Sequence, residues 1–352
     1  MDRNFVGLLK SSIVGDLDAF LVNCMKISEL FSNVGRVAIK LHMGEFGNLH
    51  YVRPPLVGRL VEVLQGLGNE VFLFDTPTLY NGSRGTVEGY IDTARRNGFT
   101  KEVIGCPIVI SDEAVQVPTD GILGHINVAK PLLDADAIFV LSHGKGHSDL
   151  AFGGAIKNLA MGATNKQTKR DLHKKPKPTL TGECTGCGTC QNLCPLGAIS
   201  IVDSCVQFNY DNCFGCGVCA KMCPTKGLAQ QVTIEELFAE TYVAIKNSFQ
   251  NKPTFYVTVL MDITPRCDCL PVGGTDEGFP ICQDVGVLAA NNALTIDQAA
   301  IQLVHQNCGN KLQKMHYKDP MTTLELVKSK TGKTEPYRIY DYQTKQFLNS
   351  IN

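Results

Sequence analysis

The fold is decided by residues 35–76, which read GRVAIKLHMGEFGNLHYVRPPLVGRLVEVLQGLGNEVFLFDT. The two ends of this stretch, GRVAIKLHM (35–43) and EVFLFDT (70–76), are apolar runs typical of buried strands. Between them, RPPLVGRLVEVLQGLG (53–68) has apolar residues at helical spacing and prolines near its start, where a helix tolerates them. A strand, a helix and a second strand in this order predict a βαβ crossover with parallel strands.

The same alternation continues on both sides of a cysteine-dense middle segment. Periodicity predicts further helices over 86–98, 153–162, 232–249 and 295–307, the last with Thr295 as its N-cap, and further strands over 107–110, 137–144, 253–263 and 284–290. Strands separated by helices in this way favour an α/β fold, with a mostly parallel sheet and flanking helices.

Composition and charge exclude several classes of protein. Of the 352 residues, 44% are hydrophobic and 19% are charged, which does not fit a disordered chain. The 33 basic residues nearly balance the 34 acidic ones, so phosphate neutralisation gives no reason to expect a nucleic-acid partner. No apolar run reaches the roughly eighteen residues of a membrane span, and the start MDRNFVGLLKSS lacks the pattern of a secretion signal. We therefore expect a cytoplasmic protein without a membrane span.

The chain has 15 cysteines, and their spacing is informative. A reducing compartment keeps thiols free, so metal binding or catalysis explains them better than disulfides. Residues 184–195, CTGCGTCQNLCP, and 213–224, CFGCGVCAKMCP, both follow the pattern C-x₂-C-x₂-C-x₃-C-P of two-cluster ferredoxins, in which the fourth cysteine of each run serves the other cluster. We therefore expect two [4Fe–4S] clusters, one bound by Cys184, Cys187, Cys190 and Cys223 and the other by Cys213, Cys216, Cys219 and Cys194.

Two other interpretations of the cysteine runs stay open. Pairs of C-x₂-C also form zinc ribbons, but a zinc ion needs only four ligands, and each run already supplies four at ferredoxin spacing. The clusters could also be purely structural, although a pair of clusters is the arrangement of an electron relay. Over about residues 180–230 the chain resembles a bacterial-type two-cluster ferredoxin, and this resemblance implies one-electron transfer at low potential.

These patterns divide the chain into an α/β domain and an insertion. Residues 1–165 and 231–352 are expected to form the two parts of the α/β domain. Residues 181–230 are expected to form a ferredoxin-like α+β module between them. The joining residues 166–180 are basic and contain prolines, which predicts an exposed linker.

A candidate site in the α/β domain lies in residues 141–162, LSHGKGHSDLAFGGAIKNLAMG. A predicted strand runs here into a loop and a glycine-led helix, and ligands of such folds bind at the carboxyl ends of strands. The candidate catalytic residues, able to transfer protons or hold an anion, are His143, Lys145, His147 and Lys157, with Lys40 and His42 from the end of the first predicted strand. A solvated loop with unremarkable histidines is the alternative, because no phosphate-binding or dinucleotide-binding glycine motif is present.

A third group of cysteines follows another predicted strand. Cys267 and Cys269, with Cys282 further along, are flanked by aspartates and form a possible site for an additional metal. A C-x-C pair is less diagnostic than C-x₂-C, and cysteines are commonly buried thiols, so a structural role for these cysteines stays open.

Three groups of motifs resemble a known family. They are AIKLHMGE (38–45), HGKGH (143–147) with GGAIKNLAMG (153–162), and CDC (267–269) with DVGVLAANNALTIDQA (284–299). They are similar to those of the prokaryotic proteins grouped by the domain of unknown function numbered three hundred and sixty-two, which are often fused to ferredoxin modules, and the resemblance covers nearly the whole chain. Residues 292–297, NALTID, lack the proline of the family's usual Asp-Pro-Val-Ala-Ile-Asp run. The resemblance implies an α/β scaffold with iron–sulfur cofactors and no established reaction.

Three functions are compatible with these motifs. The first, which we expect, is an oxidoreductase whose ferredoxin module exchanges electrons with the candidate site. Because the module is tethered to the α/β domain, this electron delivery is intramolecular. The substrate bound at the candidate site is then a small anionic molecule. The second is a non-enzymatic electron carrier or docking subunit of a larger redox complex, with the basic residues 166–177 facing an acidic redox partner protein. The third is a metallocofactor-handling protein built on the third group of cysteines. No serine–histidine–aspartate set or paired-carboxylate pattern indicates a hydrolase.

Overall fold

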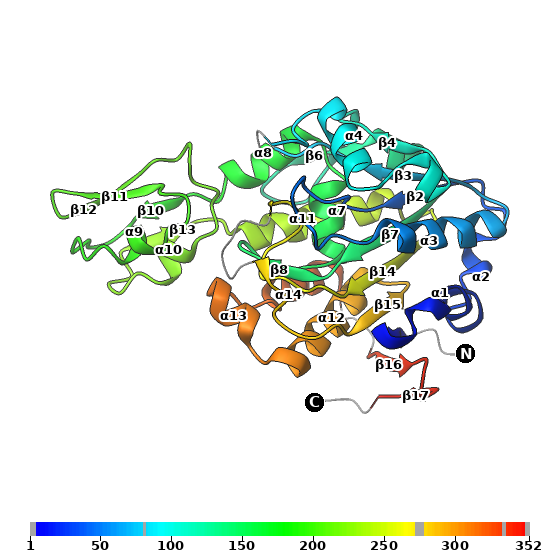
Figure 1. The fold of residues 1–352 in the computed structure, drawn as a ribbon. Coiled ribbons are helices and arrows are strands. Elements are labelled where there is room, and N and C mark those ends of the chain that lie inside the picture. The colour runs from blue at the N-terminus through cyan, green and yellow to red at the C-terminus, as the bar shows by residue number, and fades with distance from the viewer. Residues whose placement is uncertain (1–4, 80–81, 272–277, 333–335, 349–352) are drawn as a thin grey trace.

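The computed structural model describes residues 5–79, 82–271, 278–332 and 336–348. Within them, nine strands form one large sheet in the order β17-β16-β1-β15-β14-β7-β2-β3-β4 (Figure 1). Their bounds in this order are Gln346–Phe347, Arg338–Asp341, Phe5–Lys10, Gly286–Ala290, Thr254–Leu260, Ala137–His143, Arg36–Lys40, Glu70–Asp75 and Ile108–Ile110. The strands from β14 to β4 are parallel, whereas β15 runs antiparallel to both of its neighbours and β17 antiparallel to β16. The expected mixed α/β fold with a large, mostly parallel sheet is confirmed.

Alternate residues of the central strand β7 supply two cores, one on each face of the sheet. Ile138 and Val140 belong to one core, and Phe139 and Leu141 to the other, because successive side chains of a strand point to opposite faces. The first core includes helices α7 (Ala155–Gly162), α11 (Ile234–Ser248), α12 (Ala293–Cys308) and α14 (Thr322–Thr331), and the second includes α3 (Pro54–Gly66) and α4 (Val87–Arg96). Burial on both faces explains why β7 is a nearly continuous apolar run.

The elements expected from periodicity are present, with small shifts in their bounds. One detail is wrong: α12 begins earlier than expected, because Asn292 and not Thr295 is its N-cap. The Asn292 side chain accepts hydrogen bonds from Leu294 N–H at 2.9 Å and from Thr295 N–H at 3.3 Å. Strands β1, β16 and β17 were not expected, and they extend the sheet beyond β15.

Shorter elements connect the main helices and strands. They are η1 (Ser11–Asp16), α1 (Leu17–Ala19), η2 (Phe20–Cys24), α2 (Ser28–Phe31), α5 (Lys101–Ile104), α6 (Lys130–Asp134) and α13 (Lys311–His316), with the antiparallel pairs β5–β6 (Ala114–Pro118 and His125–Ala129) and β8–β9 (Lys145–His147 and Ala151–Gly153). The β8–β9 pair carries two of the candidate catalytic residues. Across the described ranges, every helix is too short or too polar to cross a bilayer.

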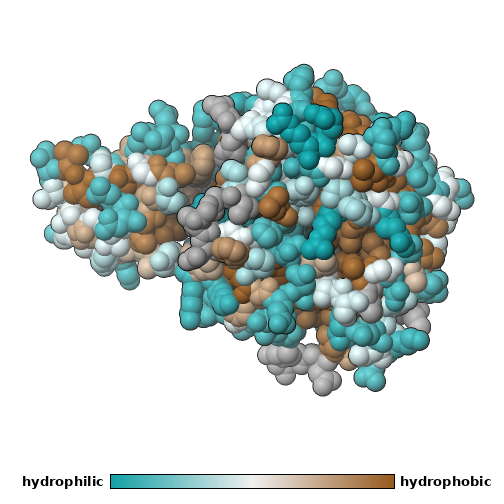
Figure 2. Space-filling view, in the orientation of Figure 1, coloured by the Kyte–Doolittle hydropathy of each residue, from teal (hydrophilic) through white to brown (hydrophobic). Residues whose placement is uncertain are grey.

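Residues 178–230 form a small lobe, called here the cysteine lobe, which projects from the α/β domain at the left of Figure 1. It contains the strand pairs β10–β13 (Pro178–Leu180 and Leu228–Gln230) and β11–β12 (Ile199–Val202 and Cys205–Phe208), with helices α9 (Thr189–Leu193) and α10 (Val218–Lys221). Its own hydrophobic cluster consists of Cys190, Ile199, Val206, Cys219 and Leu228. Apolar side chains also gather on the surface of this lobe in Figure 2.

The exposed linker expected at residues 166–180 is wrong for its first half. Lys166–Lys174 form helix α8, whose buried side chains are Thr168, Lys169, Leu172 and His173. Lys169 extends into the α/β domain, where its Nζ donates a hydrogen bond to Pro77 O at 2.6 Å. The number of basic residues in this segment indicated a solvated linker. That number does not distinguish a lysine on the surface from a lysine that has buried partners.

Candidate active site

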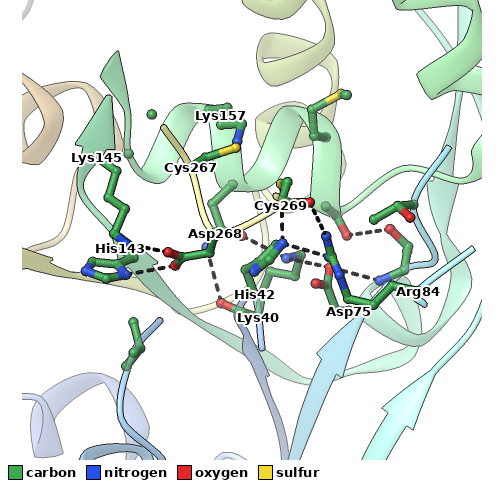
Figure 3. A pocket seen from close by; sticks show the side chains of 18 of the residues that line it. Lys40, His42, Asp75, Arg84, His143, Lys145, Lys157, Cys267, Asp268 and Cys269 are labelled. Atoms are coloured by element: carbon green, nitrogen blue, oxygen red, sulfur yellow. Dashed lines mark hydrogen bonds and ion pairs between the residues drawn. The ribbon is translucent and has the colours of Figure 1, made fainter. Parts of the chain in front are cut away.

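A cavity opens where strands β2, β3 and β7 end. Its volume is about 890 Å³, including its open mouth. The polar and charged residues that line it are Lys40, His42, Asp75, Thr76, Thr78, Arg84, His143, Lys145, Lys157, Asn158, Lys169, Cys267, Asp268 and Cys269. Figure 3 shows the labelled side chains among them converging from the strand ends, from helix α7 and from the segment 267–269. The carboxyl edge of a parallel sheet is where α/β folds bind ligands, so this cavity is the candidate active site.

Most residues predicted for the site lie in this cavity: Lys40, His42, His143, Lys145, Lys157, Cys267 and Cys269. His147 and Cys282 do not line it. His147 is buried on β8, where its Nδ1 accepts a hydrogen bond from Asp149 N–H at 3.2 Å. Burial, reinforced by the positive charge of Lys157, lowers the pKa of His147 to about 4, so this ring is neutral. Cys282 is hydrogen-bonded to Cys308 instead.

A buried ion pair, Lys40–Asp75, joins the ends of β2 and β3. Lys40 Nζ lies 3.0 Å from Asp75 Oδ1 and donates to Asn158 Oδ1 at 2.8 Å, and the Tyr90 hydroxyl donates to Asp75. Burial raises the pKa of Asp75, but Lys40 and neighbouring cations outweigh it and hold that pKa below its usual value. A Cβ on Gly162 would lie 2.2 Å from Lys40 Nζ, so only glycine lets helix α7 come this close.

Arg84, which the sequence analysis did not identify, joins three parts of the cavity wall. Its Nε lies 3.0 Å from Glu45 Oε2, its Nη2 donates to Cys269 O at 3.3 Å, and its Nη1 lies 2.7 Å from His42 Nε2. His42 Nδ1 accepts a hydrogen bond from Gly44 N–H at 3.0 Å. These contacts fix the imidazole of His42 and the backbone at Cys269, two groups that are remote in the sequence.

Asp268 holds two of the predicted site residues. Its Oδ2 lies 2.8 Å from His143 Nδ1, and its Oδ1 lies 2.6 Å from Lys145 Nζ. His143 Nε2 lies 2.6 Å from Met261 O, so both ring nitrogens face acceptors and both are placed to donate. Burial raises the pKa of Asp268, but His143 and Lys145 outweigh it and hold that pKa far below its usual value. The Asp268 carboxylate therefore fixes the side chains of His143 and Lys145 at the cavity.

Cys267 and Cys269 form a hydrogen-bonded pair beside Lys157. The hydrogen bond from Cys269, aided by Lys157, lowers the pKa of Cys267 to about 5 despite burial. The same hydrogen bond, together with burial, raises the pKa of Cys269. Burial lowers the pKa of Lys157, but the sulfurs of Cys267 and Cys269 outweigh it and raise that pKa above its usual value. At neutral pH the site therefore holds a thiolate, a thiol and an ammonium group in contact.

Helix α7, which carries Lys157 and Asn158, is anchored by a carboxylate from α12. The backbone N–H groups of Ala155 and Ile156 donate to Asp297 Oδ1 and Oδ2 at 2.7 and 2.9 Å. Burial raises the pKa of Asp297 to about 7, although these two hydrogen bonds oppose it. Asp297 is thus a positioning residue for the start of α7.

Asp297→Ala is expected to destabilise the protein by about 1–3 kcal/mol, because two buried N–H groups lose their acceptors. The raised pKa also gives a pH dependence. The folded state binds the extra proton between the unfolded pKa of about 3.9 and the folded value, so the stability contributed by this carboxyl falls as pH rises through that window. Anaerobic thermal unfolding of wild type and Asp297→Asn checks this. The stability of wild type relative to the Asp297→Asn variant should fall as pH rises from 4 to 7. A difference that does not change with pH would contradict the assignment.

The second cysteine run of the cysteine lobe packs against helix α8. The rings of His173 and Phe214 lie 5.4 Å apart, and His173 Nδ1 lies 3.2 Å from Phe214 O. Burial raises the pKa of the nearby Cys216 to about 11. Helix α8 also carries Lys169, which lines the cavity. One helix therefore contacts both the second cysteine run and the candidate active site.

The cysteine lobe carries the eight cysteines that are expected to bind two [4Fe–4S] clusters. A small hollow of about 330 Å³ is lined by the cysteines expected for one cluster, Cys184, Cys187, Cys190 and Cys223. For the other, Cys213 and Cys216 both act on the pKa of Cys219, and Cys194 packs on the same hydrophobic cluster as Cys219. In the described part of the chain, no three His, Cys, Asp or Glu side chains are close enough to hold one metal ion. The hollow and the four cysteines that line it fit the first expected cluster.

The fold and the site define an α/β protein with a charged, thiol-bearing cavity at the carboxyl edge of its sheet. The family model described as "Domain of unknown function (DUF362)" matches residues 37–302, and the chain belongs to this family. No curated protein matches the chain.

Two solved structures are similar over most of this chain. The lactate racemase apoprotein from Thermoanaerobacterium thermosaccharolyticum has 12% identity and a TM-score of 0.42, over 86% of this chain and 57% of the racemase. A protein from Thermotoga maritima has 13% identity and a TM-score of 0.46, over 85% of this chain and 60% of that one. The chain therefore spans less than two thirds of either structure.

Proposed function

We propose that the protein is an iron–sulfur oxidoreductase, in which the cysteine lobe transfers electrons to or from the cavity of the α/β domain. One observation carries this proposal: helix α8 contacts the second cysteine run through His173 and lines the cavity through Lys169. An electron relay that is tethered beside a substrate site delivers its electrons within one molecule. Tethering therefore raises the effective concentration of the electron donor at that site.

The two cysteine runs would hold the clusters in the arrangement expected from their spacing. When bound, the clusters supply one-electron transfer at low potential. Cys187 of the first run is exposed, so this run suits exchange with an external redox partner protein. The second run lies against α8, so it suits exchange with the cavity.

The charges of the cavity favour a small anionic substrate. The lysine and arginine side chains that line it, among the described residues, are Lys40, Arg84, Lys145, Lys157 and Lys169. Four of them have an anionic partner, respectively Asp75, Glu45, Asp268 and the Cys267 thiolate. Lys169 instead donates to the neutral oxygens of Thr76 and Pro77, so its ammonium can also bind an anionic group of a substrate. Burial lowers the pKa of Lys169 to about 8, which suits a proton donor near neutral pH.

The alternative of a docking subunit has less support. In that role the lysines of residues 166–177 would face an acidic partner. Lys166 Nζ donates to Gly85 O at 2.7 Å, and Lys177 Nζ donates to Tyr210 O at 3.0 Å. With Lys169 buried in the cavity, much of this basic charge already serves contacts within the chain.

Protein purified without oxygen is expected to contain about eight irons per chain. Cys187→Ser removes one expected ligand at an exposed position, so it should lower the iron content and alter the electron paramagnetic resonance signal of one cluster only. Cys205→Ser is the matched control, because Cys205 lies in the same lobe and matches no ligand position. Elemental analysis that finds zinc in place of iron would contradict the clusters.

Transfer to the cavity is tested with reduced protein and small electron acceptors. Protein reduced by photoreduced flavin is mixed with 2-oxo acids, unsaturated carboxylates or dicarboxylate disulfides, and the return of the cluster absorption is followed. Lys169→Met should slow reoxidation by the effective acceptor without changing the iron content, because it removes the Lys169 ammonium. Equal rates in wild type and variant with every acceptor would show that the cavity is not the substrate site.

A further inference from the structure

Cys267 and Cys269 are neighbours in the wall of the cavity, and their sulfurs share a hydrogen bond. The residue between them, Asp268, is held by His143 at 2.8 Å and by Lys145 at 2.6 Å, so the segment that presents both sulfurs is fixed. In Figure 3 both cysteines lie at the cavity. A small molecule that enters the cavity therefore meets two adjacent sulfurs.

The surroundings of this pair distinguish one sulfur from the other. Lys157 lies beside Cys267 and stabilises its thiolate, as Figure 3 shows. On the other side, His42 Nε2 lies 3.3 Å from the Cys269 sulfur and 2.7 Å from Arg84 Nη1. Cys267, beside the Lys157 ammonium, is thus the attacking sulfur, and Cys269 is the resolving thiol.

The structure separates this pair from the third cysteine of its sequence motif. Cys282 does not line the cavity, and its thiol is hydrogen-bonded to Cys308. Burial raises the pKa of Cys282 to about 12, so it stays a protonated thiol. Two hydrogen-bonded sulfurs in the wall of one cavity are the arrangement of a redox-active dithiol, in which one attacks and the other resolves.

We propose that Cys267 and Cys269 form a reversible disulfide, that this pair is the two-electron redox centre of the cavity, and that its substrate is a small anionic disulfide. The two adjacent sulfurs in the cavity wall account for the disulfide class, and the Lys169 ammonium, which donates to the neutral oxygens of Thr76 and Pro77, accounts for the anionic group. The supply of electrons to the pair rests on the function proposed above, whereas formation of the disulfide does not.

The reaction balances in atoms and electrons. The Cys267 thiolate attacks one sulfur of the substrate RSSR, forms a mixed disulfide and releases RS⁻. The Cys269 proton passes to this RS⁻, and the Cys269 sulfur then attacks that of Cys267, which releases a second RS⁻ and closes the disulfide. Two electrons from the low-potential one-electron donors of the cysteine lobe, with one proton, restore thiolate and thiol. The sum is RSSR, two electrons and one proton, giving RSH and RS⁻.

The dithiol is tested by a thiol titration that needs no turnover. Anaerobic protein is equilibrated in a series of buffers that differ in the ratio of oxidised to reduced dithiothreitol, and its free thiols are then alkylated. The mass of the peptide containing residues 267–269 is measured by mass spectrometry. We expect two alkylated cysteines in reducing buffer and none in oxidising buffer, following a two-electron curve. Cys267→Ser should leave Cys269 alkylated at every ratio, whereas the control Cys282→Ser should not change the curve. Two thiols that stay alkylated throughout, or a bound metal that is lost in Cys267→Ser, would overturn the proposal.

The asymmetry of the pair gives a second readout. In wild type, alkylation of Cys267 should already be fast a little above pH 5, because its thiolate is formed there. In Lys157→Met the same rate profile should shift to higher pH, because the neighbouring ammonium is lost. An unshifted profile would overturn the role of Lys157 as the partner of the thiolate.

The substrate class is tested with two probes. Reduced protein should release thiol faster from dithiodiglycolate, which carries two carboxylates, than from the neutral hydroxyethyl disulfide, and equal rates would overturn the anionic class. If reduction of the clusters by photoreduced flavin leaves the disulfide closed while dithiothreitol opens it, the proposed electron transfer fails and the dithiol stands. If a chain with its full iron content forms no disulfide, the dithiol fails and the proposed electron transfer stands.

Discussion

Asp75→Leu is expected to lower the free energy of unfolding by about 3–5 kcal/mol, the largest stability effect among the site residues, because it leaves a buried ammonium without its counter-charge. Asp75 and Lys40 are almost fully buried, at 4% and 1% side-chain exposure, and lie 3.0 Å apart. The negative charge of the Asp75 carboxylate also stabilises the charged form of Lys169. Anaerobic urea unfolding of the variant measures the loss.

The double variant Lys40→Met with Asp75→Leu separates the pair from the packing around it. It should recover much of the lost stability, because both charges are then replaced by apolar groups of similar size. Asp134→Leu is the matched control: its pair with Lys130 is about half exposed, so its loss should cost far less. A double variant as unstable as the single one would show that packing, not charge, sets the cost.

The same pair predicts an acid dependence of stability. Burial raises the pKa of Asp75, but Lys40 outweighs it, and the folded pKa lies below its usual value. A depressed pKa contributes stability that is complete above the unfolded value of about 3.9 and is lost as pH falls below it. The gap in stability between wild type and the double variant should therefore narrow only under acid conditions.

The parallel half of the sheet could be predicted because each of its elements is encoded locally. Strand β7 is apolar over residues 137–141, as a strand covered on both faces requires, and α11 has the apolar spacing of a helix. The strands beyond β15 could not be predicted in this way. β1 lies between β15 and β16, which come from the other end of the chain, and no local pattern records such a pairing.

The candidate site was predictable where reactive or charged residues stand at the carboxyl end of a predicted strand. Lys40 and His143 close β2 and β7, and parallel strands bring their carboxyl ends to one edge. Arg84 and Lys169 were missed, because each enters the cavity from a segment whose sequence suggests only a polar surface. Buried charges of this kind are visible only through their partners, such as Glu45 for Arg84, 39 residues away.

The order of the electron path gives the prediction with the largest effect on activity. In Cys216→Ser the second cluster should be lost, since Cys216 is one of its expected ligands, while the first cluster is kept. Electrons must then reach the cavity from solution, so delivery should fall by about 10²–10⁴-fold, the usual advantage of tethering. The measurement is the single-turnover reoxidation of flavin-reduced protein by the effective acceptor.

Cys187→Ser supplies the contrast, because it removes the first cluster and leaves the second beside α8. A small reductant such as photoreduced flavin should reduce the second cluster directly, so reoxidation through the cavity should persist in this variant. The contact between His173 and Phe214 is the physical reason for this asymmetry, since it joins only the second run to the helix that lines the cavity. If both variants lose delivery to the same extent, electrons do not pass from the second run to the cavity in the order that this contact indicates.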